Sequence, residues 1–239
     1  GTDACKQAAD IILLDDDFST LCEAVRQGRT VYSNIRKFVR YLISCNIGEV
    51  MVMFLSIILG MPVILLPTQI LLVNLVTDGL PAMEKTEKAV MEMKPQRFSG
   101  DFFSGGLLHK IIIRGILIGI CTLGCFAYSL MYIGTELAVA RTCALVTLIA
   151  SQLIHVFECR SEYVSIFRMN PFKNFWLLLA VIFSAALTAL CIYLPQASIV
   201  METVPLNPAE MAWSLIFAAA VPIVSGLLML IFRKNRSKE

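Results

Sequence analysis

Long stretches without a charged side chain alternate along this chain with short clusters of charge. Residues 115–134, 175–201 and 211–232 contain no Asp, Glu, Lys or Arg over 20, 27 and 22 positions, respectively. Uncharged stretches of about 18 residues or more are typical of membrane-spanning helices, because a helix of that length satisfies its backbone across about 30 Å of hydrocarbon. The alternative, buried helices in a large soluble core, does not require runs of this length.

We interpret the whole pattern as an all-α membrane protein with six transmembrane helices. The predicted spans lie at about residues 40–60, 69–83, 107–131, 140–158, 175–195 and 211–232. Composition agrees, since 57% of the residues are hydrophobic and only 16% are charged, against about 25% charged in a typical soluble domain. The eight cysteines show no CxxC spacing and indicate no disulfide framework.

The basic residues fall almost entirely on one side of this topology. Nineteen of the 20 Lys and Arg residues lie on one side, namely before or at the start of the first span, between the second span and the entry of the third, after the fourth span, or in the tail. Lys110 and Arg114 are those at the entry of the third span, and Arg141 is the exception. The opposite loops, near residues 60–68, 132–139 and 196–210, contain acidic residues but no Lys or Arg. The positive-inside rule therefore predicts a multi-pass protein in membrane lipid, with both termini cytoplasmic.

The first 40 residues have the pattern of a soluble α/β domain that leads into a helix. Residues 9–14 predict a short buried strand, and the three Asp residues that follow predict a solvated turn at a helix N-terminus rather than a metal site. From Ser19 the apolar residues recur at helical spacing, with Asp17 or Ser19 as the candidate N-cap. Residues 32–40 contain no Pro or Gly, so we expect one continuous helix into the first span. We place the boundary between this soluble part and the transmembrane domain between residues 32 and 33.

Two consecutive spans carry polar side chains at membrane depth. Asn46 and Glu49 are three residues apart in the first span, and Asn74, Thr77 and Asp78 are separated by three and four residues in the second. Side chains at these offsets share one face of a helix. Each span therefore presents one polar face to its surroundings.

The second span is expected to unwind directly after these residues. Gly79 and Pro81 follow Asp78, and Gly lowers helix preference while Pro removes an amide hydrogen and clashes with the preceding turn. Irregular backbone at membrane depth is tolerated only where it lines a cavity in the protein, and its freed carbonyl groups become ion ligands.

These features together predict an intramembrane site for a hard cation. A carboxylate at the bilayer centre costs roughly 2.5–3.5 kcal/mol on insertion scales, so Glu49 and Asp78 need a cation or protons. Carboxylate, amide and hydroxyl oxygens suit Ca²⁺, which takes six to eight oxygen ligands, whereas copper and zinc prefer nitrogen and sulfur. The alternative is a polar interhelical hydrogen-bond network, although such networks usually employ neutral Ser, Thr or Asn.

Several segments resemble type II, calcium-transporting P-type ATPases. NLVTDGLPA (74–82) resembles the sixth transmembrane helix of that family, and RYLISCNIGEV (40–50) resembles the fifth helix of the sarco/endoplasmic-reticulum-like pumps. AADIILLDDDFSTL and EAVRQGRTVYSNIRKF resemble the end of the phosphorylation domain and the stalk, and SEYVSIFRMNPFKN (161–174) resembles the loop between the eighth and ninth helices. The resemblance implies that the six spans are helices five to ten of a ten-helix calcium pump, preceded by a short remnant of the phosphorylation domain.

The resemblance also implies a set of calcium ligands. They are the five polar residues already selected and one position in the eighth helix, namely Asn46, Glu49, Asn74, Thr77, Asp78 and Gln152. The two-calcium pumps have a Glu where this chain has Gln152. In this respect the chain resembles the plasma-membrane pumps, which carry one calcium, although it retains Glu49, unlike those pumps. We therefore expect one calcium per cycle. In the same helix, we interpret Glu158 as a surface or loop-anchoring group and His155 as hydrogen-bonded packing.

ATP and Mg²⁺ are implied for the intact pump, but the chain carries no motif that binds them. The family's DKTGT and TGDGxND motifs and a P-loop do not occur, and the opening GTDACKQAAD lacks an initiator Met. We expect a fragment that is inactive alone and has no catalytic residues. Its partner would be the N-terminal part of the same pump, which supplies helices one to four and the actuator, nucleotide and phosphorylation domains.

Three other functions stay open at this point, and none involves nucleic acid. The first is a P-type pump for Mn²⁺ or a monovalent cation. The second is an unrelated secondary transporter or channel, and the third is a purely structural membrane domain. Oxygen ligands do not exclude Mn²⁺, whereas the predicted strand, turn and helix before the first span speak against a secondary transporter.

Overall fold

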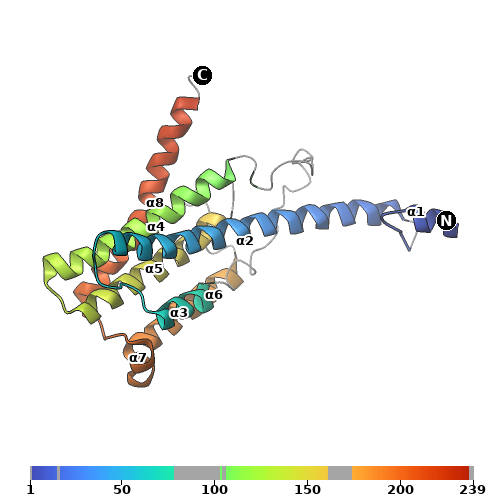
Figure 1. The fold of residues 1–239 in the computed structure, drawn as a ribbon. Coiled ribbons are helices and arrows are strands. Elements are labelled where there is room, and N and C mark those ends of the chain that lie inside the picture. The colour runs from blue at the N-terminus through green and yellow to red at the C-terminus, as the bar shows by residue number, and fades with distance from the viewer. Residues whose placement is uncertain (1, 15–16, 78–102, 104–105, 161–173, 237–239) are drawn as a thin grey trace.

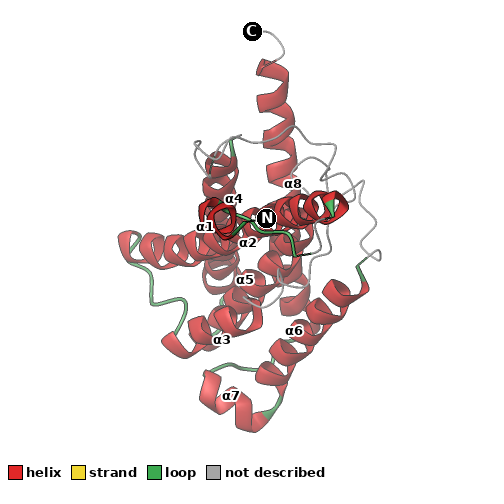
Figure 2. Ribbon diagram, turned by 90° about the vertical axis from the view of Figure 1, so that its right-hand side faces the viewer, coloured by secondary structure: helices red, strands yellow, loops and turns green. Residues whose placement is uncertain are grey.

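A computed structural model describes residues 2–14, 17–77, 103, 106–160 and 174–236 of the chain. These residues form helices joined by loops, and none of them lies in a strand (Figure 2). In chain order the elements are α1 (Asp3–Ala8), α2 (Phe18–Ile58), α3 (Pro67–Thr77), α4 (Leu107–Ala127), the π-helical η2 (Tyr128–Ile133), α5 (Leu137–Cys159), α6 (Phe175–Tyr193), α7 (Pro195–Met201) and α8 (Pro208–Arg236).

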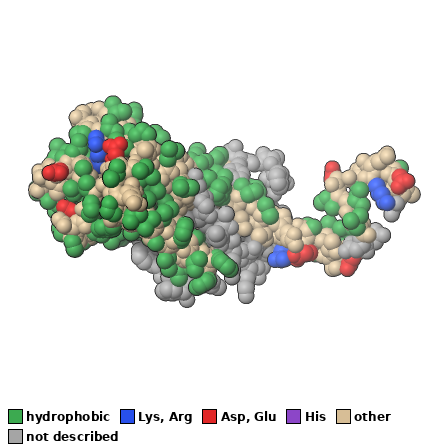
Figure 3. All heavy atoms as spheres, turned by 90° about the horizontal axis from the view of Figure 1, so that it is seen from below, with side chains coloured by type: hydrophobic (Ala, Val, Ile, Leu, Met, Phe, Trp, Pro, Cys, Tyr) green, Lys and Arg blue, Asp and Glu red, His purple; other side chains and the backbone are tan. Residues whose placement is uncertain are grey.

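The predicted all-helical membrane architecture is confirmed. Within the described part of the chain, five helices are long and apolar enough to cross a membrane: α2, α4 with η2, α5, α6 and α8. The predicted second span corresponds to the shorter apolar helix α3, which is described only as far as Thr77. In the view of Figure 3, hydrophobic side chains cover much of the bundle, and the charged side chains lie at one end of it and along the protruding N-terminal arm.

Helix α2 is a single helix that extends far beyond the bundle, as predicted for the stalk (Figure 1). Its 41 residues span about 62 Å, roughly twice the thickness of the hydrocarbon layer. Asp17 is the N-cap, and one of its carboxylate oxygens accepts a hydrogen bond from the Ser19 amide at 2.9 Å. This bond and one from the Ser19 hydroxyl lower the pKa of the Asp17 carboxyl.

The strand predicted over residues 9–14 is not formed. The chain before it folds instead into the short helix α1, and residues 11–13 have no regular structure. Ile11 is 66% exposed and Leu14 is 98% exposed, so neither packs into a core. A strand requires a neighbour to satisfy its amide and carbonyl groups, and the described residues supply none. The apolar run over residues 9–14 was therefore not sufficient to predict a strand.

Helices α2 and α4 lie side by side because glycine lets their backbones approach closely (Figure 1). A Cβ atom added to Gly115 of α4 would lie 2.5 Å from Ile47 Cγ2 and 2.9 Å from the carbonyl oxygen of Ser44 in α2. A Cβ atom on Gly48 would lie 2.8 Å from Ile118 Cγ2. Small residues are the usual means of close helix packing in membranes, where van der Waals contact replaces the hydrophobic effect.

Helix α5 occupies the centre of the bundle and contacts α2, α3, α4, α6 and α8. Leu145, Leu148 and Ile149 on this helix are almost completely buried. At the opposite end from the stalk, side chains tie the connecting loops to it: Arg141 Nε donates to the Val63 carbonyl at 2.8 Å, and Thr142 Oγ1 accepts from the Val204 amide at 3.2 Å. The structure thus gives a role to Arg141, the basic residue that departs from the charge bias.

The glycine contacts predict the effect of adding one methyl group. In the intact protein, Gly115→Ala should destabilise the fold by roughly 1–3 kcal/mol, because the Ser44 carbonyl is backbone and cannot move aside without shifting α2. The matched control is Gly28→Ala in the exposed stalk, where nothing lies within 4 Å of the added Cβ atom. Thermal inactivation in detergent measures the difference. Equal temperatures for the two variants would contradict the proposed packing constraint.

Candidate intramembrane cation site

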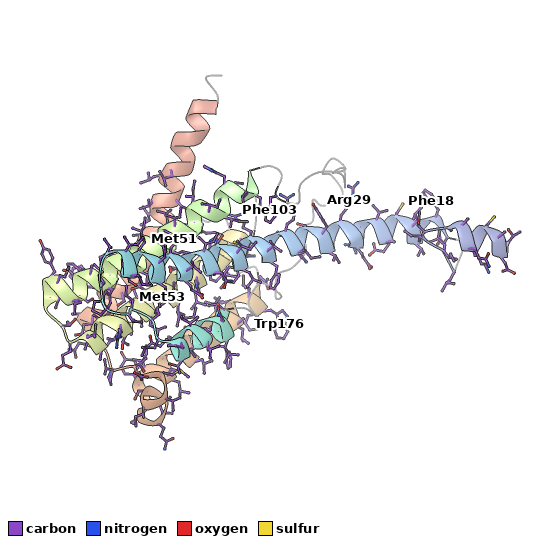
Figure 4. The ribbon with its side chains drawn as sticks, in the orientation of Figure 1. Phe18, Arg29, Met51, Met53, Phe103 and Trp176 are labelled. Carbon is purple, nitrogen blue, oxygen red and sulfur yellow. The ribbon has the colours of Figure 1, made fainter. Side chains whose placement is uncertain are left out.

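A hydrogen bond between α2 and α5 joins two of the predicted ligands. Gln152 Nε2 donates to Glu49 Oε1 at 3.0 Å across 103 residues of sequence. Glu49 is 6% exposed and Gln152 is fully buried. Met51 and Met53, labelled in Figure 4, mark the adjacent part of α2, which lies inside the bundle rather than in the stalk. The structure therefore places a carboxylate and a carboxamide together at membrane depth.

The carboxamide of Gln152 has a second atom that is available to a ligand. Its Oε1 is buried and makes no hydrogen bond to any residue that the structure describes. A buried carbonyl-type oxygen without a partner is unfavourable by roughly 1–3 kcal/mol. A hard cation between this oxygen and the Glu49 carboxylate would remove that penalty and neutralise the carboxylate.

Asn46 is not placed beside Glu49 in the way that the sequence predicted. Its side chain is exposed, and Nδ2 donates to the Leu42 carbonyl of the same helix at 2.9 Å. Residues three apart on an α-helix are rotated by about 60° about the axis. Glu49 faces α5, and this rotation is sufficient to turn Asn46 away from that contact. Among the described residues, the Asn46 and Glu49 side chains therefore contact different partners, although they lie within about 60° of each other around α2.

The second span contributes one buried and one partly buried candidate. Thr77 is 1% exposed, and its hydroxyl donates to the Val73 carbonyl at 2.9 Å. Asn74, three residues earlier, is half-buried. The adjacent Val76 carbonyl accepts a hydrogen bond from the Ser184 hydroxyl of α6 at 2.9 Å. Asp78 and the expected unwinding at Gly79 and Pro81 lie outside the described residues.

An ion pair that the sequence reasoning missed lies nearby. Arg114 of α4 is 4% exposed and forms a salt bridge with Glu158 of α5, whose side chain is 11% exposed. Glu158 thus forms a contact between helices and is not a surface group, and its other predicted role, anchoring the following loop, falls on residues outside those described. His155 is buried, and its Nδ1 lies 3.1 Å from Glu158 Oε2, which confirms that it is hydrogen-bonded packing.

The periodicity of α4 contains the signal that would have found this pair. Leu107, Ile111 and Ile118 are buried at helical spacing, and Arg114 falls on the same stripe. A charge on the apolar stripe of a membrane helix requires a partner. The position of Arg114 in the chain groups it with the cytoplasmic basic residues, whereas its place on this buried stripe shows that it faces the helix bundle.

The donor chemistry narrows what such a site can hold. The part of the chain that the structure describes contains no group of three or more His, Cys, Asp or Glu residues suited to a metal ion. The described candidate ligands Glu49, Gln152, Asn74 and Thr77 offer carboxylate, amide and hydroxyl oxygens. This set is suited to calcium-like ions and not to zinc or copper.

Comparison with known proteins agrees with this chemistry. The family described as "Cation transporting ATPase, C-terminus" matches residues 62–231. The chain is 42% identical over 236 residues to a calcium-transporting ATPase of Bacillus subtilis, which covers 96% of this chain and 26% of that protein. It is 32% identical to a calcium-transporting ATPase of Plasmodium falciparum, over all of this chain and 23% of the relative.

A plant relative extends the range of similar proteins. An endoplasmic reticulum-type calcium-transporting ATPase of Arabidopsis thaliana is 31% identical over 98% of this chain and 27% of its own length. The chain thus spans about a quarter of the length of these curated relatives.

The contact between Gln152 and Glu49 makes a prediction for the metal-free protein. Gln152→Leu in the intact protein should lower stability in the presence of a chelator by roughly 1–3 kcal/mol, because the buried Glu49 carboxylate loses the hydrogen bond from the Gln152 amide. Adding Glu49→Leu should recover most of the loss, since two apolar groups leave no unsatisfied charge. Thermal inactivation measures both variants, and a double variant no more stable than Gln152→Leu would contradict the interaction.

Proposed function

The chain belongs to the cation-transporting ATPase family, as part of its C-terminal region, and on this premise we propose that it is part of an ATP-driven calcium pump. Within that pump it would supply much of the intramembrane calcium site and the stalk that couples the site to phosphorylation. The observation that supports this most strongly is the contact between the buried Glu49 carboxylate and the Gln152 carboxamide, whose Oε1 makes no hydrogen bond to any described residue. Calcium is the transported substrate rather than a resident cofactor.

We assign the ion to a cage of oxygen donors from three helices. Its proposed ligands are Glu49 in α2, Asn74, Thr77 and Asp78 in or after α3, and Gln152 in α5. The predicted ligand Asn46 would join them only by turning its side chain away from the Leu42 carbonyl and toward the cage. Glu49 and Gln152 are already in contact, and Thr77 is buried. The printed names of the relatives, which are calcium-transporting ATPases, favour Ca²⁺ over Mn²⁺ and monovalent cations for the same donors.

The proposal assigns a mechanical role to α2. This helix is unbroken from Phe18 to Ile58 and carries Glu49 in its membrane portion. A movement applied to its protruding end would therefore displace Glu49 relative to Gln152 and open the cage. The ATP and Mg²⁺ that drive the movement would bind the remaining domains of the whole pump, with both termini of this chain on the cytoplasmic side.

Removing a carboxylate from the cage tests the proposal. In the intact pump, Glu49→Gln and Asp78→Asn should each abolish calcium-activated phosphorylation by ATP, because the neutral side chain no longer balances the charge of the ion. The matched control is Glu136→Gln, an exposed residue at the other end of α5, which should leave the calcium response unchanged. Preserved calcium activation in both cage variants would reject the assignment.

The neutral side chain of Gln152 is the basis of a proposal about the number of ions bound. Because Gln152 is neutral, we propose that the pump binds one Ca²⁺, and that Gln152→Glu adds a carboxylate sufficient to bind a second ion or to tighten the first. Equilibrium binding of radioactive calcium, normalised to the amount of intact pump, should approach one ion for the wild type. A wild-type value of two would show that the carboxamide does not limit the site.

A further inference from the structure

A buried ionic cluster joins three helices close to the proposed cage. Arg114 of α4 pairs with Glu158 of α5 and also donates from Nη1 to the Val221 carbonyl of α8 at 2.8 Å. Glu158 in turn contacts His155 Nδ1 at 3.1 Å. The cluster therefore fixes α5 against α4 and α8 through directional bonds, in a region where most other contacts are apolar.

The same cluster reaches α2 through His155. The imidazole stacks on the ring of Tyr41, with centroids 5.9 Å apart and planes inclined by 24°. Both side chains are almost completely buried. His155 lies three residues after Gln152, which is about 4.5 Å along the axis of α5. Two successive turns of α5 thus contact α2, one through His155 and Tyr41 and the other through Gln152 and Glu49.

These contacts restrict the rotation of α5 about its own axis. Arg114 holds a planar guanidinium between Glu158 and the Val221 carbonyl, and such groups bond only in a narrow range of directions. Glu158 orients the His155 ring, which is confined by Tyr41. A rotation that moved Gln152 away from Glu49 would therefore strain the salt bridge and the ring stack together.

We propose that Arg114, Glu158 and His155 are positioning residues for the cation site, because they set the orientation of α5 at which Gln152 meets Glu49. The inference rests on the proposed function in one respect, namely that calcium binds at Glu49. The three residues do not touch the ion in this arrangement. They act as an outer shell whose loss would misplace a ligand, an effect that typically lowers metal affinity by about 10- to 100-fold.

The test is the calcium dependence of phosphorylation in the intact pump. Arg114→Gln and Glu158→Ala should each raise the calcium concentration for half-maximal phosphorylation by about tenfold or more. Arg141→Gln is the matched control, because this Arg also donates to a loop carbonyl but lies at the opposite end of α5. Unchanged half-maximal concentrations in both cluster variants would overturn the proposal.

A double-mutant cycle separates positioning from a merely structural role. In a Gln152→Ala background, Glu158→Ala should shift the half-maximal calcium concentration much less than it does alone, because the ligand that the cluster positions is already gone. A shift of undiminished size would show that Glu158 acts by another route and would overturn the proposal.

Conservative variants keep the test decisive if a charge deletion prevents folding. The exchange of Arg114→Glu with Glu158→Arg should recover part of the lost affinity, and His155→Asn should weaken calcium binding while the salt bridge is intact. Wild-type affinity in His155→Asn would overturn the role of the ring stack. A wild-type pump without calcium-dependent phosphorylation would instead refute the proposed function itself, so the two failures are distinguishable.

Discussion

The carboxylate of Glu49 imposes the main physical constraint on this structure. It lies in the membrane portion of a helix and is almost fully removed from solvent, where an ionised group is unfavourable unless it has a partner. One hydrogen bond from Gln152 provides part of that compensation. A cation bound at this position would balance the negative charge of the carboxylate, which is the physical basis of the proposed site.

The packing of the bundle fixes the positions of α2 and α5, which carry Glu49 and Gln152. Gly48 and Gly115 allow α2 and α4 to approach closely, while α5 lies at the centre and contacts the helices on every side. The ion pair of Arg114 and Glu158 adds a directional contact between α4 and α5. A site built in this way is sensitive to small movements of α2, which is the property that a stalk-driven transporter requires.

The sequence predicted the helices well because their signal is local. Charge-free runs and helical spacing located the spans, and Asp17, one of the two candidate N-caps, is the one observed. Partners far apart in the sequence were harder to predict. Gln152 was selected only from a family resemblance, and the pairing of Arg114 with Glu158 was missed because it depends on which faces of α4 and α5 meet. The strand over residues 9–14 failed because pairing, rather than hydrophobicity, makes a strand.

The most direct test is a structure of the intact protein determined with Ca²⁺ bound and again without it. The account predicts an ion about 2.3–2.6 Å from an oxygen of Glu49 and from the Gln152 amide oxygen, the usual range for calcium. It also predicts that removing the ion restores the hydrogen bond between the two side chains. An ion bound elsewhere in the membrane, with Glu49 still bonded to the Gln152 amide nitrogen, would contradict the account.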